Sequence, residues 1–200
     1  MKQYLKSFTL LSLSIFFITF TACDNEPLDR GLNTLNSSNN TNSSSFIGDW
    51  EIVSFETETD TEITFMGETN TSNNDIVGLD MNYIVSFTEN TFETAGDYSM
   101  HLITSFNGSV LQEQTETYSN VSGSGTYTVS GNTLTTDGAF FEFEFQDVDM
   151  SDYAGEQTVQ YAFSNGGQTL TIIQTQEISE DQGGIESTTL VYSVTIMNKL

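Results

Sequence analysis

The chain has 200 residues, of which 28 are acidic and 4 are basic, so its formal net charge is −24. A chain this acidic repels phosphate backbones, which excludes nucleic-acid binding through a basic face. Cys23 is the only cysteine, so disulfides and thiolate metal clusters are excluded as well. The folded part must therefore be held together by its hydrophobic core.

The start of the chain has the order of a secretory signal peptide. Two lysines precede an apolar run from Ser7 to Phe20, and the small residues Thr21-Ala22 stand directly before Cys23. The run is shorter than the roughly 20 residues that a membrane-spanning helix needs, so an uncleaved anchor is the less favoured alternative. We therefore predict a signal peptide over residues 1–22.

This arrangement resembles the lipobox of bacterial lipoproteins, in which the cysteine is acylated and the leader is cut just before it. The resemblance implies lipidation of Cys23 and attachment to a membrane through its acyl chains, because two or three chains give stable anchoring. It also implies a place in the bacterial cell envelope, with the outer membrane expected. Both its periplasmic and its cell-surface face remain open.

The segment after Cys23 is dominated by Asn, Ser and Thr up to Ser45. Such a composition buries too little apolar surface to offset the entropy of ordering the chain. We predict that residues 23–45 form a disordered tether.

From Phe46 to the end, residues 46–200, apolar side chains alternate with polar ones at a period of two, which is typical of strands with one core-facing row. The clearest rows are Tyr83/Val85/Phe87, Phe141/Phe143/Phe145, Val159/Tyr161/Phe163 and Leu190/Tyr192/Val194/Ile196. Turn residues separate these rows at Glu89-Asn90, Ser130–Asn132, Asp137-Gly138, Asn165–Gly167 and Gly183-Gly184. The pattern predicts an all-β domain of short strands. We expect an antiparallel up-and-down meander closing into a β-barrel, with a β-sandwich as the alternative.

Gly48-Asp49-Trp50 opens the first strand, and a hairpin follows over Gly125–Leu134. A Gly-x-Trp at the start of a β meander resembles the first signature of the lipocalins. Together with the lipobox it resembles the lipocalin-like lipoproteins of the Bacteroidetes. The resemblance implies that Gly48 and Trp50 close one end of the barrel. The resemblance further implies that Lys199, the only basic residue of the folded domain, would take the place of the family's arginine over the tryptophan.

The resemblance implies a binding module whose apolar interior holds a small hydrophobic ligand, or else a structural module of the envelope. Candidate ligand-facing residues are Tyr192, Val194, Phe143 and Tyr161. The alternative is a surface β-sandwich that contacts glycans or proteins.

Chemistry-bearing clusters are few. Asp147, Asp149 and Asp152 are a candidate calcium site, but the glycine and the twelfth-position acid of a calcium loop are missing, so a solvated loop is the favoured interpretation. His101 is the only histidine, and no Gly-x-Ser-x-Gly motif is present to supply a nucleophile. We therefore expect neither an enzyme nor a bound cofactor.

Overall fold

The domain is built almost entirely of β-strands. The computed structural model describes residues 43–141, 144–145, 148–149, 156–182 and 184–200. A short 3-10 helix, η1 (Ser43–Ser45), precedes the strands. These are β1 (Gly48–Phe65), β2 (Glu68–Phe87), β3 (Thr91–Phe106), β4 (Ser109–Ser130), β5 (Thr133–Asp137), β6 (Glu144–Phe145), β7 (Val148–Asp149), β8 (Glu156–Ser164), β9 (Thr169–Gln182) and β10 (Ile185–Lys199).

Eight of these strands close into one barrel in the order β1-β10-β9-β8-β5-β4-β3-β2, and β6 and β7 form a separate two-stranded sheet. All neighbours in the barrel pair antiparallel. The predicted all-β meander barrel is thus confirmed, in a form consistent with lipocalins, and the β-sandwich alternative is wrong.

The core fills the end of the barrel where β5 and β8 complete the circle. Its largest fully buried side chains include Phe46, Trp50, Tyr83, Tyr98 and Phe92. Aromatic rings pack edge-to-face there, which favours their attraction beyond simple area burial. This end of the molecule therefore has a dense aromatic interior.

Two tight turns join long neighbouring strands. Met66 and Gly67 connect β1 to β2, and Asn107 and Gly108 connect β3 to β4, all four with positive φ. Two residues with positive φ form the turn whose twist matches that of paired strands. The turns predicted at Glu89-Asn90, at Gly131-Asn132 and within Asn165–Gly167 also lie between strands.

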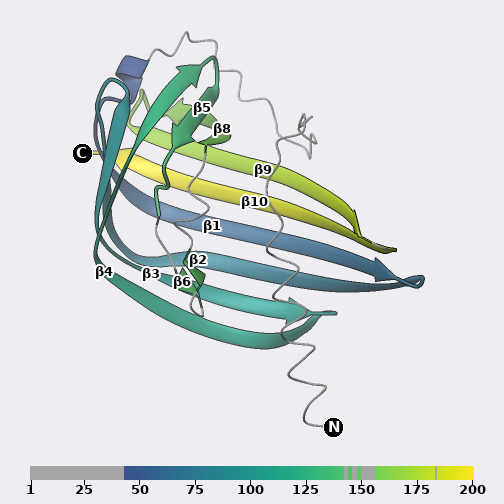
Figure 1. Cartoon of the computed structure of the whole chain (residues 1–200). Helices are drawn as coiled ribbons and strands as arrows, with labels where there is room; N and C mark the ends of the chain where they lie inside the picture. Colours follow the sequence, from purple (N-terminus) through teal and green to yellow (C-terminus); the bar gives the residue numbers. More distant parts are fainter. Residues whose placement is uncertain (1–42, 142–143, 146–147, 150–155, 183) are drawn as a thin grey trace.

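The sheet is longer than the closed part of the barrel. β5 pairs with β4 only over Thr126–Ser130, and β8 pairs with β9 only over Thr169–Ile173. Figure 1 shows β9, β10, β1, β2, β3 and β4 running on beyond this end as one curved, open sheet. We call this open part the trough: residues 57–65, 68–76, 102–106, 109–114, 174–182 and 185–193.

The prediction of short strands is wrong, because the six strands of the trough have 14 to 22 residues each. The row Phe141/Phe143/Phe145 is also not one strand. Phe141 lies before β6, outside any strand, and is buried against the rings of Phe55, Tyr83 and Tyr98. Phe141, the member of this row whose side chain the structure describes, thus packs on the core from a connecting segment.

Candidate functional site

Trp50 lies at the closed end of the barrel and is fully buried. Its indole Nε1 donates a hydrogen bond of 2.6 Å to the carbonyl oxygen of Phe46. The N–H group therefore has the partner that a buried tryptophan requires. Phe163 packs against the indole ring, with 5.8 Å between the ring centroids.

Lys199 pairs directly with Trp50 across the β1–β10 ladder. Its Nζ lies 5.1 Å from the centroid of the indole ring, within the range of a cation–π contact. Gly48, with φ of +125°, passes close to the lysine: a Cβ at that position would lie 3.3 Å from Lys199 Cε. The structure thus brings together the three residues to which the sequence assigns barrel closure.

Tyr161 faces the interior of the barrel and is buried among aromatic rings. Its hydroxyl donates a 2.8 Å hydrogen bond to the carbonyl oxygen of Gly131. The side chain is therefore part of the packed core at the closed end. Since this core is filled by its own side chains, the trough is where the inner face of the sheet is open to a ligand.

The two faces of the trough differ in charge. Along β1, the residues that follow buried Phe55 at a period of two are Thr57, Thr59 and Thr61, so these threonines lie on the inner face. Glu56, Glu58, Asp60 and Glu62 alternate with them and lie on the outer face. The acids are thus turned to solvent, and the inner face of β1 is neutral and polar.

The same order continues across the sheet as transverse rows of paired residues. One row consists of Gln176, Val191, Thr59, Asn74, Thr104 and Gln112, taken from β9 to β4. The next row toward the barrel consists of Gln174, Ser193, Thr57, Ile76, Leu102 and Gln114. Neither row contains a charged side chain.

Hydrogen bonds between neighbouring strands hold these side chains in place. Thr57 donates to the Ser193 hydroxyl at 2.9 Å, and the hydroxyls of Thr61 and Thr189 lie 3.1 Å apart. Thr104 Oγ1 donates to the side-chain oxygen of Asn74 at 2.8 Å. The inner face therefore carries an ordered array of hydroxyl and amide groups, among which lie the apolar side chains of Val191, Ile76 and Leu102.

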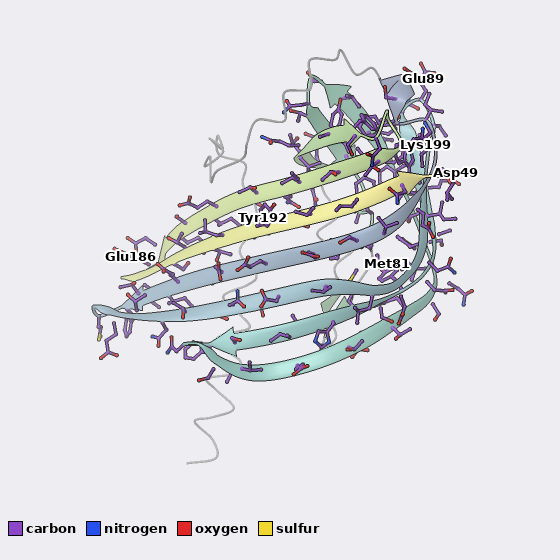
Figure 2. All side chains as sticks on the ribbon, turned by 180° about the vertical axis from the view of Figure 1, so that it is seen from behind. Asp49, Met81, Glu89, Glu186, Tyr192 and Lys199 are labelled. Atoms are coloured by element: carbon purple, nitrogen blue, oxygen red, sulfur yellow. The ribbon has the colours of Figure 1, made fainter. Side chains whose placement is uncertain are left out.

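Tyr192 and Val194 were expected to face the interior, and this expectation is wrong. Thr195 and Met197 are buried in the core. Since side chains alternate along a strand, Tyr192, Val194 and Ile196 point to the outer face of β10. Tyr192 is 45% exposed. In Figure 2, seen from behind, it lies midway along β10, between Glu186 near the open end and Lys199 at the closed end.

The remaining predicted residues cannot be placed. Cys23, Phe143, Asp147 and Asp152 lie outside the described residues, as do the signal peptide and nearly all of the tether, and for Asp149 the structure describes only the backbone of β7. Within residues 43–200, excluding the undescribed positions, no group of His, Cys, Asp and Glu could hold a metal ion. No helix among the described residues is long and apolar enough to cross a membrane.

His101 lies on the outer face of β3. Its Nδ1 is 2.9 Å from the Thr115 hydroxyl, and its Nε2 is 3.5 Å from a carboxylate oxygen of Glu113. Both neighbours are on the adjacent strand β4, so the imidazole is engaged in cross-strand contacts.

Comparison with protein families, curated proteins and solved structures finds no match to this chain.

Proposed function

We propose that the protein is a lipid-anchored binding module of the bacterial cell envelope whose ligand lies in the trough. The observation that carries this proposal is the division of one continuous sheet into a filled barrel end and an open, curved end. Small barrels either fill their interior with side chains or enclose a ligand. Here the filled end supplies stability, and the open end offers a preformed concave surface.

The anchor rests on the sequence. The leader before Cys23 and its resemblance to a lipobox support acylation at that thiol, and the membrane we propose is the outer membrane. The Asn- and Ser-rich segment up to Ser45 supports display of the domain away from the membrane surface. Replacement of Cys23 by Ala should abolish labelling with a radioactive fatty acid and move the protein to the soluble fraction. Unchanged membrane association of the variant would refute the anchor.

The ligand site is tested with a matched pair of variants on β10. Val191 lies on the inner face, in the row between Gln176 and Thr59, and Val194 lies on the outer face of the same strand. A carboxylate at Val191 would have to be desolvated beneath a bound molecule, whereas one at Val194 lies on the opposite face of the sheet from that molecule.

The mature lipidated chain is purified from a bacterial host and examined by native mass spectrometry for bound molecules and by fluorescence for uptake of Nile red, a neutral apolar probe. Val191→Asp should weaken binding by at least about tenfold, and Val194→Asp should leave it within about twofold. Equal binding by the two variants would refute the trough as the ligand site.

A further inference from the structure

We propose that the trough is built for an uncharged, hydroxyl-rich chain, an oligosaccharide, rather than for a purely apolar molecule. This inference rests on the proposed function, because it names the class of ligand for the same site. It starts from the chemistry of the inner face, where the row through Thr59 holds five hydroxyl or amide side chains and one valine: Gln176, Val191, Thr59, Asn74, Thr104 and Gln112.

Charge excludes two classes of ligand. An anionic ligand is repelled by a chain of net charge −24, and the inner rows offer it no cation. A cationic ligand would be drawn to the outer face, where Glu56, Glu58 and Glu62 are exposed, and not to the two inner rows nearest the barrel, which carry no charged side chain. The trough therefore favours an uncharged ligand.

The array of hydroxyl and amide groups argues against a purely apolar ligand. A molecule that covered Thr59 and Asn74 without hydrogen-bonding groups would strip water from the Thr59 hydroxyl and from the Asn74 amide N–H groups without replacing those hydrogen bonds. An oligosaccharide replaces those water contacts with its own hydroxyls. The half-buried rings and chains among the polar groups, such as Phe106 and Val191, can meet the apolar faces of sugar rings.

The side chains are also held ready for such a ligand. A hydroxyl has one donor and two acceptor positions. Thr57 donates its hydroxyl hydrogen to Ser193, and Thr104 donates its hydroxyl hydrogen to Asn74. The two threonine oxygens can still accept hydrogen bonds, and the existing bonds hold these oxygens in place. Fixed polar groups lower the entropic cost of binding.

The shape of the surface suits a chain more than a single ring. The row through Thr59 crosses six strands, and neighbouring strands lie about 4.8 Å apart, so the row follows the curve of the sheet for about 24 Å. A linear oligosaccharide of several units can lie along such a row.

The test uses calorimetry on the full mature chain with linear, neutral hexasaccharides of glucose and of mannose. Thr59→Val and Asn74→Leu each remove a polar group from the inner face at nearly constant shape. Their matched controls are Thr175→Val and Asn73→Leu, which make the same exchanges on the outer face. Thermal melting of all four variants verifies that they fold.

The inner-face variants should weaken saccharide binding by about tenfold each and the outer-face controls by less than about twofold. Saccharide binding that does not respond to the inner-face variants would overturn the inference. Nile red uptake that depends on Val191, with no saccharide binding, would overturn the saccharide class and leave the proposed function standing. Absence of any ligand that responds to Val191→Asp would overturn both.

Discussion

Replacement of Trp50 by Phe should destabilise the domain strongly, because the indole donates a hydrogen bond and fills a fully buried position at the closed end. Its hydrogen bond to the Phe46 carbonyl contributes about 1 kcal/mol. The smaller ring leaves a partly unfilled space in a fully buried position, at about 1–2 kcal/mol. The free energy of unfolding should therefore fall by about 2–3 kcal/mol.

The contribution of Lys199 is separable from this loss. Lys199→Met keeps an aliphatic chain over the ring and removes the charge 5.1 Å from its centroid, so it should cost about 0.5–1 kcal/mol. Urea unfolding followed by far-ultraviolet circular dichroism, which does not depend on the lost indole, measures both variants and their combination. The double-mutant cycle should give a coupling of about 0.5 kcal/mol or more.

A coupling within about 0.3 kcal/mol of zero would show that the lysine and the indole act independently. A loss below about 1 kcal/mol for Trp50→Phe alone would show that the tryptophan does not close the barrel. Either result would refute the structural role assigned to this pair.

Three further predictions concern the closed end. Burial, and secondarily the charge of Glu89, raise the pKa of Tyr127 above its ordinary value of 10.0. Above pH 10 the unfolded chain therefore loses this proton more readily than the folded chain, so the free energy of unfolding falls as the pH rises. Tyr127→Phe should flatten this decline, measured by urea unfolding at several pH values. An unchanged dependence on pH would contradict the raised pKa of Tyr127. A Cβ on Gly125 would lie 2.3 Å from the carbonyl oxygen of Asp137, so Gly125→Ala should lower the melting temperature by many degrees, whereas a change within error would show that β4 shifts freely. Phe141→Ala should cost about 3–5 kcal/mol in urea unfolding, because this buried ring packs against three others, and a loss below about 1 kcal/mol would mean that the segment is not part of the core.

The closed end was predictable from the sequence because its strands carry one apolar row each. Tyr83, Val85 and Phe87 alternate with Ile84 and Ser86, and all three members of the row are buried in the structure. The hydrophobic period reports burial directly, so it identifies strands that face a core. The position of Lys199 over Trp50 also follows from the sequence, since the resemblance calls for one cation there and the folded domain has one.

The trough escaped prediction because neither face of its strands is consistently apolar. From Glu56 to Glu62, β1 alternates acids with threonines, so a search for hydrophobic periodicity finds no signal. The threonines favour extended structure, and the strict alternation of charged with neutral residues was the available signal for a two-faced strand. Charge periodicity, rather than hydrophobic periodicity, would have revealed the length of the strands.

On β10 both alternate rows of side chains contain apolar residues, and the more apolar row is not the one that faces the core. Leu190, Tyr192, Val194 and Ile196 form the more apolar row, yet the buried row contains Thr195 and Met197. Thr195 pairs with Phe55 in the register of β1 and β10, and this long-range pairing decides which face turns inward. A single strand considered alone does not contain that information.

The open edges of the trough offer a structural reason for the acidity of the chain. Among the described residues, β9 from Gln174 to Gln182 and β4 from Ser109 to Gly125 pair on one side only, which leaves two long strand edges. Exposed edges promote pairing between molecules unless prolines, lysines or charges oppose it. The only proline of the sequence, Pro27, lies before the barrel, and the one lysine of the folded domain is Lys199 at the closed end. Charge repulsion is therefore one means of keeping the edges of separate molecules apart, and acids on the outer face of the sheet provide it while the two inner rows nearest the barrel stay neutral.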